Sequence, residues 1–423
     1  MRPSSKPFFS FSLLTLSCSS LLLQHRAIAQ DAVQDPGVYG PPVELVHSYF
    51  DEWPTGIAVS NDGRLFSNYP LGLDAANTRY QVAELHDDGT ETPYPSVEIN
   101  TPPGGAVNYS TNPPTGANYP DHLIAVQSVV IDPKNRLWIV DTGRPLLSDG
   151  TQLTSTYGGP KLVGVDLATN SVFKTILFPP NVSYPESYPN DVRFDLRPGI
   201  TDSGEGVAYL TDSSTEGRNG LIVVDLGTGV SWRHLDTHPS VRADNEFYLS
   251  IWGEPVYTNP GGGKPIIPML MGSDGITLSA DGETLFYTAV SSRYLYNIPT
   301  AILRDHTSPS AELEALSSVM QLTQKGVSDG LESDSNGYVY GGSFETNSVN
   351  VYFPENGTVD TFVRDPRVEW TDTLSVGTDG YLYFTENQNW RRPGGWEGVD
   401  RRVKPYSLYR VPLPDGGKKI ELV

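Results

Sequence analysis

The sequence predicts an all-β fold, a six-bladed β-propeller with four-stranded antiparallel blades. Short runs rich in Val, Ile, Tyr and Phe alternate with Gly, Asp, Asn and Pro, which is the pattern of strands and turns. A unit of two such runs joined by a tight turn recurs six times along the chain. Stretches with helical spacing are nearly absent, and the exceptions are 300–304 and 311–315.

Each copy of this unit is a short apolar strand, a turn of the Asp-Gly or Asn-Gly kind in most copies, and a second aromatic-rich strand. The apolar strands of the six copies begin at Gly56, Val129, Val192, Gly275, Gly330 and Leu374. Asn and Gly tolerate the positive φ of a two-residue hairpin turn, so we expect such turns here. Most copies are followed by another strand pair, as in 348–353 and 359–363. Six units of about four strands, arranged radially, define a propeller.

The two ends of the chain are expected to close the ring. Residues 43–49 and 406–411 both have strand character, and their pairing would join the last unit to the first. No linker-like stretch divides residues 30–423, which we therefore predict to be a single propeller domain. A β-sandwich, or two smaller β domains, is the alternative, and six copies of one hairpin argue against it.

Residues 1–29 have the pattern of a secretory signal peptide. Arg2 and Lys6 precede a mostly apolar run from 8 to 23, and residues 27–29 offer the small-x-small sequence of a cleavage site. The only cysteine, Cys18, lies in this segment, so a secreted mature chain would contain no disulfide. We expect secretion, and glycan acceptor triplets begin at Asn108, Asn181 and Asn356.

The charge balance narrows the classes of partner. The chain carries 29 Lys and Arg against 50 Asp and Glu, a formal net charge of −21. A surface this acidic repels nucleic acid and anionic lipid, so we expect neither nucleic acid nor membrane as a partner. No nucleotide-binding or zinc-binding motif is apparent, and the sequence predicts no cofactor and no metal. The expected partner is a small aromatic or terpenoid molecule.

Polar residues recur just before or at the start of the predicted innermost strands, where the strands meet the mouth of the central channel. They are Gln127, Asn190, Asp191, Asp274, Asp329 and Asp372, with Trp53 and Thr55 in the first unit. We take Asp191, Asp274, Asp329 and Asp372 as candidate catalytic residues, because crowded carboxyls gain raised pKa values and exchange protons. Two alternatives remain open for these aspartates: they cap turns, or they bind a hard cation such as calcium.

Aromatic side chains supply the second half of the predicted site. Flat indole faces suit a planar conjugated substrate or an apolar terpene. The candidate substrate-binding residues are Trp53, Thr55, Gln127, Trp370, Glu386, Asn387, Trp390 and Trp396. The segment 387–402 adds four arginines to two of these tryptophans. It forms either a lid that donates hydrogen bonds to a substrate carbonyl or a surface loop that pairs with nearby carboxylates.

Three groups of motifs resemble the yellow / major royal jelly protein family. The motifs are RLWIVDTG at 136–143, AYLTDS at 208–213 with GLIVVD at 220–225 and SWR at 231–233, and SDGITLS at 273–279 with LFYT at 285–288, SDGL at 328–331 and WTDTLS at 370–375. The resemblance extends from about residue 43 to residue 412. It implies a six-bladed propeller, secretion and frequent glycosylation. Insect members usually carry cysteines in the mature chain, and the absence of cysteine here looks more like the fungal branch.

The resemblance also implies candidate activities. Similar fungal proteins promote a hetero-Diels–Alder reaction between a tropolone-derived quinone methide and a humulene-type terpene. Insect relatives include dopachrome-converting isomerases and non-catalytic binders of amines. The function predicted from the resemblance is therefore a secreted, cofactor-free enzyme of secondary metabolism similar to these hetero-Diels–Alderases. A dopachrome-type isomerase and a non-catalytic small-molecule-binding protein are the alternatives.

Overall fold

The computed structural model describes residues 37–259, 265–395 and 398–423. Residues 39–423 form one compact unit, and the description below concerns that unit. The predicted signal peptide at 1–29 lies outside the described residues. Among the helices of the described residues, none has the length and hydropathy needed to cross a membrane.

The described part of the chain contains six four-stranded antiparallel sheets, each named here after its inner strand. The first three sheets are β2 (Gly56–Val59), β3 (Leu65–Asn68), β4 (Val82–Leu85) and β5 (Glu91–Pro93); β8 (Val126–Ile131), β9 (Arg136–Asp141), β10 (Lys161–Asp166) and β11 (Ser171–Leu177); and β12 (Pro189–Asp195), β13 (Val207–Asp212), β14 (Leu221–Asp225) and β15 (Ser231–His234). The other three are β19 (Ser273–Leu278), β20 (Thr284–Ala289), β21 (Tyr294–Pro299) and β22 (Met320–Gln324); β23 (Leu331–Ser333), β24 (Val339–Ser343), β25 (Ser348–Phe353) and β26 (Thr358–Arg364); and β27 (Thr371–Val376), β28 (Tyr381–Glu386), β29 (Tyr406–Pro412) and β1 (Glu44–Tyr49).

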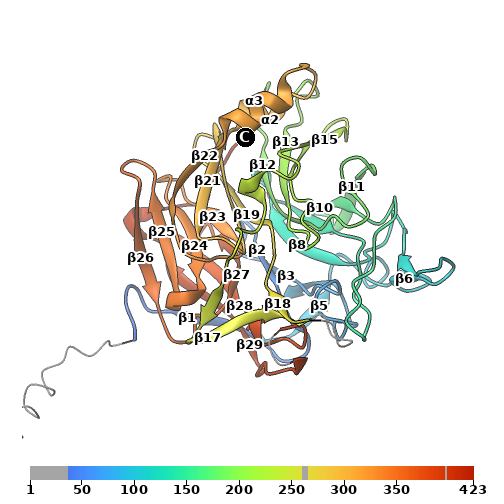
Figure 1. Cartoon of the computed structure of the whole chain (residues 1–423), viewed down its shortest axis with the longest axis horizontal. Helices are drawn as coiled ribbons and strands as arrows, with labels where there is room; N and C mark the ends of the chain where they lie inside the picture. Colours follow the sequence, from blue (N-terminus) through green and yellow to red (C-terminus); the bar gives the residue numbers. More distant parts are fainter. Residues whose placement is uncertain (1–36, 260–264, 396–397) are drawn as a thin grey trace, which may run out of the picture. The chain divides into compact units, whose positions relative to one another are not determined.

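The inner strands of the six sheets lie together around a common centre. Each contacts the inner strands of two other sheets, in the cyclic order β2, β8, β12, β19, β23, β27 and back to β2. Figure 1 shows these labels near the middle of the unit, with outer strands such as β26 and β11 at the periphery. This radial arrangement is typical of β-propellers.

The predicted pairing of the two chain ends is confirmed. Strand β1 pairs antiparallel with β29, with Tyr49 opposite Tyr406 and Glu44 opposite Arg410. One sheet is therefore built from both ends of the chain, and no inner strand lacks a neighbour on either side. Joining the ends in this way ties the closing sheet together by backbone hydrogen bonds.

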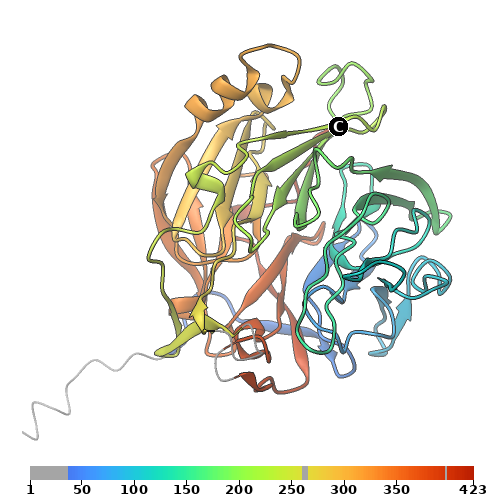
Figure 2. The ribbon, with the colours of Figure 1, turned by 45° about the vertical axis from the view of Figure 1, so that its right-hand side comes forward.

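The remaining elements lie outside these sheets. They are the strands β6 (Val107–Asn108), β7 (Thr115–Gly116), β16 (Leu249–Ile251), β17 (Glu254–Thr258) and β18 (Ile267–Pro268), the helices α2 (Thr300–Arg304) and α3 (Ala311–Ser318), and the short 3-10 helices Pro239–Val241, Phe344–Thr346, Asn389–Arg391 and Pro414–Gly416. The two α-helices occupy the segments with predicted helical spacing. They pack on β21, and they are the orange helices at the upper rim in Figure 2.

The turns between the first two strands of the sheets differ from the predicted two-residue form. In the β8 sheet, the Asn135 N–H donates to the Asp132 carbonyl and the Asp132 N–H donates to the Arg136 carbonyl, both at 2.9 Å. Only Asn135 has a positive φ, at 58°. The loop is a turn followed by one left-handed residue, and the equivalent left-handed positions in other sheets are Gly63, Gly282, Gly337 and Gly380. Gly and Asn were thus predicted at the right places in a longer loop.

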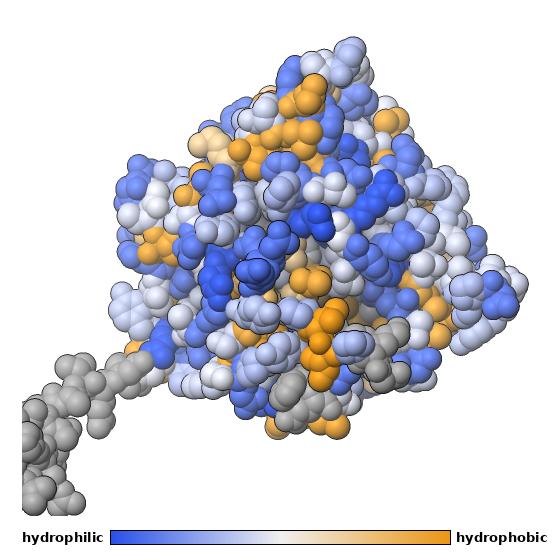
Figure 3. All heavy atoms as spheres, in the orientation of Figure 1, coloured by the Kyte–Doolittle hydropathy of each residue, from blue (hydrophilic) through white to orange (hydrophobic). Residues whose placement is uncertain are grey.

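The core lies in layers between neighbouring sheets. Trp138 on β9 is fully buried and stacks on Phe194 of the β12 sheet, with ring centroids 5.3 Å apart. Its indole N–H donates to the Asp132 carboxylate at 2.8 Å, so the polar end of the ring is also satisfied. The face drawn in Figure 3 is largely hydrophilic, with apolar side chains in a few separate groups.

Replacing Trp138 with Ala tests this layered packing. Because the indole fills the space between two sheets, we expect W138A to lower the free energy of unfolding by about 3–5 kcal/mol. The same substitution at Trp252, which is 52% exposed, serves as the control and should cost far less. Urea denaturation measures both changes, and equal losses for the two variants would contradict the packing described here.

Candidate functional site

Four inner strands carry a β-bulge within their first residues. The register of β8 on β9 shifts between Val126 and Ser128, and β12, β19 and β27 show shifts at the equivalent point. A bulge leaves its extra residue out of the ladder and turns that side chain in a new direction. The bulges contain the predicted ring residues Gln127, Asn190, Asp191, Asp274 and Asp372.

Hydrogen bonds from neighbouring sheets hold the bulges in place. The Ser128 hydroxyl donates to the Asn190 carbonyl at 2.6 Å, and the Thr211 hydroxyl donates to the Asp274 carbonyl at 2.6 Å. The Asp372 carbonyl accepts from the Gly330 N–H at 2.8 Å. At each bulge, the buried carbonyl thus accepts a hydrogen bond from the neighbouring sheet instead of from its own, so that the polar group is not left without a donor.

Three of the four candidate catalytic aspartates line one cavity, which we call the upper cavity. It has an empty volume of about 370 Å³. Its lining residues are Leu73, Gln127, Gln152, Tyr188, Asn190, Ser213, Thr215, Met271, Asp274, Asp329, Asp372 and Asn389. These residues lie in nine separate segments of the chain, which meet here because the inner strands converge on one centre.

Asp274, Asp329 and Asp372 form a hydrogen-bonded group that we call the carboxyl triad. Asp329 is hydrogen-bonded to both of the other carboxyls. Each member also has an outer partner: the Trp370 indole N–H donates to Asp329 at 2.7 Å, the Asn190 amide to Asp274 at 2.6 Å, and the Asn387 amide to Asp372 at 2.7 Å. These outer donors fix the orientation of the three carboxyl groups.

Burial and mutual repulsion keep protons in the triad. Burial raises the pKa of Asp274 and of Asp372 well above the ordinary value, and the charge of Asp329 raises both further. Burial raises the pKa of Asp329 to about 6, held down by the hydrogen bond from Trp370. The geometry therefore favours an ionised Asp329 between two protonated neighbours, an arrangement that can donate and accept protons. Among the described residues, no three His, Cys, Asp or Glu side chains gather in a way that could hold a metal ion.

The structure places Asp191 away from this lining. Its carboxylate pairs with the Arg193 guanidinium at 2.7 Å, and Arg193 reaches from β12 to the Leu331 carbonyl on β23 at 2.5 Å. The two-residue bulge of β12 turns Asn190 toward the upper cavity and leaves Asp191 in this ion pair. Asp191 and Arg193 thus lie between the upper cavity and the remainder of the channel.

Most of the predicted substrate-binding residues lie behind the cavity wall. Gln127 is the one that lines it. Trp53 donates its indole N–H to the Asn387 carbonyl at 2.6 Å, and Thr55 donates to the Gln127 carbonyl at 3.2 Å. Trp370 stacks on Phe344 with ring centroids 4.1 Å apart. Trp53, Thr55 and Trp370, together with Asn387, thus position residues of the site. Trp390 is buried, and the guanidinium groups of Arg391 and Arg401 lie over its ring. Trp396 lies outside the described residues.

A second set of carboxylates, at the ends of the second strands, has a structural role. Asp141 accepts the backbone N–H groups of Ile124 and Ala125 at 2.7 and 2.9 Å. Glu386, a predicted substrate-binding residue, accepts the N–H groups of Glu369 and Trp370 in the same way. Burial raises the pKa of Glu386 to about 8. These groups stabilise the segments that lead into the inner strands.

Three residues near the triad were not among the predicted site residues. The Tyr188 hydroxyl donates to the Gln127 side chain at 2.9 Å on the cavity wall. Arg392 is half-buried over the Trp53 ring and brings positive charge near Asp372. Burial lowers the pKa of Lys325, whose charge acts on Asp329, to about 7. Arg392 belongs to the arginine-rich segment singled out in the sequence, whereas nothing in the repeat pattern distinguishes Tyr188 or Lys325.

The fold and the site together define a β-propeller with a carboxyl-lined cavity at the centre of its inner strands. The solved structure of a luciferin-regenerating enzyme superposes with a TM-score of 0.51 at 12% identity, covering 90% of this chain and 97% of that one, which supports the fold alone.

The chain belongs to the major royal jelly protein family, whose profile matches residues 124–398. Major royal jelly protein 6 of Apis mellifera is 24% identical over 236 residues, covering 55% of this chain and 48% of that protein. Major royal jelly protein 1 of the same bee is 25% identical over 244 residues, covering 56% and 51%. The chain thus spans about half the length of the curated relatives it matches.

The raised pKa of Asp329 makes a prediction about stability and pH. A carboxyl whose pKa is raised on folding stabilises the fold fully at low pH, and that stabilisation is lost as the pH rises through about 6. We expect the wild type to lose about 2 kcal/mol relative to D329N between pH 4 and pH 7.

Chemical denaturation across this pH range checks the prediction. Asp281 provides a control of opposite sign, because the hydrogen bond from Ser279 lowers its pKa. Relative to D281N, the wild type should gain stability as the pH rises. If the free energies of unfolding of wild type and D329N change in parallel with pH, the pKa of Asp329 is not raised by folding.

Proposed function

We propose that this protein is a cofactor-free enzyme that transfers protons on a small hydroxylated, conjugated molecule held in the upper cavity. The observation that carries the proposal is the carboxyl triad. Three buried carboxyls in one hydrogen-bonded group supply an acid and a base side by side at neutral pH. Residues that only capped turns would direct their carboxylates to backbone N–H groups, as Asp141 does.

The chemistry best matched to the triad is loss of water from an alcohol to give a quinone methide. Protonated Asp274 or Asp372 donates its proton to the departing hydroxyl, the C–O bond breaks, and water leaves. The Asp329 carboxylate accepts the proton of the ring hydroxyl, whose electron pair forms the new carbonyl. One proton enters and one leaves the substrate, so the triad as a whole keeps its charge. Passing the proton from Asp329 back to its neighbour resets the site.

A hetero-Diels–Alder step would follow, as the fungal resemblance suggests for a tropolonic quinone methide and a humulene-type terpene. The cycloaddition forms two bonds and moves no proton, so the protein contributes by holding the partners together. The protonated carboxyl of Asp274 or Asp372 would donate to a carbonyl of the diene, because the Asn190 amide and the Tyr188 hydroxyl at the cavity wall already donate to Asp274 and Gln127. The cavity is small, so we propose that it holds the planar molecule and that the terpene approaches from the mouth.

This small cavity favours a second candidate, an isomerase of the dopachrome-converting kind. Such a reaction moves a proton between two positions of one substrate and needs no second molecule in the cavity. The same triad would serve it, with Asp329 as base and a protonated neighbour as acid. A non-catalytic binding protein is the outcome expected if neither reaction is accelerated.

Asparagine substitutions in the triad test catalysis. We expect D274N, D329N and D372N each to lower kcat by about 10²–10⁴, because each removes one carboxyl from the proton relay. D281N, in an exposed hairpin turn, is the matched control and should leave kcat unchanged.

The assay compares three reactions with purified protein: dehydration of a hydroxylated tropolone, its cycloaddition with humulene, and decolorisation of dopachrome. Turnover in the first two supports the cyclisation, and turnover in the third alone supports the isomerase. Turnover in none of the three, or turnover that survives all three triad substitutions, would overturn the acid–base proposal.

We also infer that residues 30–423 form a single domain whose six sheets are the blades of one closed ring, and that the chain is secreted and glycosylated. The cyclic contacts of the inner strands and the pairing of β1 with β29 support six blades. Asn356 supports glycosylation, because it lies exposed in the hairpin between β25 and β26. Asn181 is also exposed, but its acceptor Ser183 is buried, and Asn108 is half-buried.

Expression in a secreting eukaryotic host tests this inference. We expect protein in the medium that begins near residue 30 and carries a glycan at Asn356. Removal of the glycan by an amidase should shift the wild type on a gel, and N356Q should show a smaller shift than N181Q. Retention inside the cell, or an unchanged mobility after amidase treatment, would contradict secretion or glycosylation respectively.

A further inference from the structure

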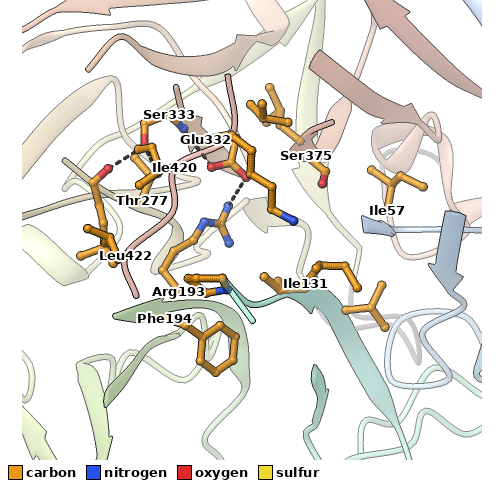
Figure 4. A pocket seen from close by; sticks show the side chains of 17 residues that line it. Ile57, Ile131, Arg193, Phe194, Thr277, Glu332, Ser333, Ser375, Ile420 and Leu422 are labelled. Atoms are coloured by element: carbon orange, nitrogen blue, oxygen red, sulfur yellow. Dashed lines mark hydrogen bonds and ion pairs between the residues drawn. The ribbon is translucent and has the colours of Figure 1, made fainter. Parts of the chain in front are cut away.

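A second cavity lies at the opposite end of the inner strands, and we call it the lower cavity. It has an empty volume of about 610 Å³ and shares no lining residue with the upper cavity. Apolar side chains near the far ends of the strands, such as Ile57, Ile131 and Leu278, form much of its wall. Figure 4 shows Ile57 and Phe194 on different sides of this space, with Arg193 extending between them toward Glu332.

The last residues of the chain form one wall of the lower cavity. Lys419, Ile420 and Leu422 line it. The segment is anchored at two points, because the Ser335 N–H donates to the Lys418 carbonyl and the Leu196 N–H donates to the Leu422 carbonyl, both at 2.8 Å. Ser335 follows β23 and Leu196 follows β12, so the C-terminal segment runs across the channel from one sheet to another.

The ionisable groups that line the lower cavity differ in how closely they are paired. Arg193, Glu332 and Lys419 are its ionisable lining residues. Glu332 already has two partners, the Ser333 N–H at 2.9 Å and Arg193 at 3.6 Å. Lys419, in contrast, makes only long hydrogen bonds, at 3.3 Å to the Val59 carbonyl and 3.4 Å to Asn61, and has no carboxylate within ion-pair distance among the described residues.

A buried donor of Arg193 is also unsatisfied. Its two terminal nitrogens bond Asp191 and the Leu331 carbonyl, but its Nε has no hydrogen-bond partner among the described residues, although the side chain is 90% buried. Burial lowers the pKa of Lys419 to about 8, although the charges of Glu332, Asp132 and Glu421 oppose this shift. Lys419 is half-buried beside an apolar space, and a cation with only long hydrogen bonds in such a place is stabilised when an anion joins it.

We propose that the lower cavity binds a small molecule with a carboxylate head and an apolar body. The carboxylate would accept hydrogen bonds from Lys419, whose own hydrogen bonds are long. The apolar body would lie against the isoleucine and leucine side chains of the strand ends and of the C-terminal segment. Because that segment supplies both the cation and part of the apolar wall, binding would also hold the end of the chain in place.

Calorimetric titration of the full chain with hexanoate tests the proposal, with hexylamine and 1-hexanol as probes of equal length. We expect hexanoate to bind at least tenfold more tightly than either probe. The proposal is overturned if the wild type does not bind hexanoate, or if it binds hexylamine as tightly as hexanoate.

Substitutions of the two neighbouring lysines locate the site. K419M should weaken hexanoate at least tenfold, K419R should retain it, and the exposed Lys418 provides the matched control K418M, which should bind as the wild type. D329N in the upper cavity should also bind hexanoate normally, so this result is independent of the proposed catalysis. Equal affinity of K419M and wild type, or loss of binding in K418M or D329N, would refute a site at Lys419.

Discussion

The hydrogen bonds that cross from one inner strand to the next are the constraint on which the rest of this structure depends. At the bulges, the carbonyls of Asn190, Asp274 and Asp372 leave their own ladders and accept from donors on the neighbouring sheet. A buried carbonyl without a donor destabilises a fold by about 1–3 kcal/mol, so each sheet can take only one position beside the next. These hydrogen bonds fix the angle between neighbouring sheets. Side chains from the bulges therefore point into one cavity.

This convergence explains why chemically identical side chains have different roles. Asp141 and Glu386 end the second strands and receive backbone N–H groups, which stabilise a local segment. Asp274 and Asp372 start inner strands, where no such groups are in reach, and they receive side-chain amides and the carboxyl of Asp329 instead. Removed from water and facing one another, these carboxyls retain protons. Proton storage at neutral pH is thus a consequence of ring geometry.

The ion pair of Asp191 and Arg193 lies between two cavities that differ in their ionisable side chains. Because Arg193 bonds the carbonyl of Leu331 on the β23 strand, its guanidinium bridges two non-adjacent sheets near the axis. The carboxyl-rich space lies toward the start of the inner strands, and the mostly apolar space with Lys419 in its wall lies toward their ends. Two ligands of different charge preference could therefore occupy one propeller without meeting.

The sequence by itself determined the repeated hairpins, the pairing of 43–49 with 406–411, and the placement of Asp274, Asp329 and Asp372 at equivalent points of their units. These features are periodic or local, and period and turn chemistry are visible along a chain. The tertiary structure alone decided which bulge residue faces the cavity, so that Asn190 entered it and Asp191 did not. It also placed the Trp53 and Trp370 side chains behind the wall of the upper cavity and Lys419 in the wall of the lower cavity. Those outcomes depend on donors and packing partners that are distant in sequence, and only the radial arrangement of the sheets brings these groups within hydrogen-bonding distance.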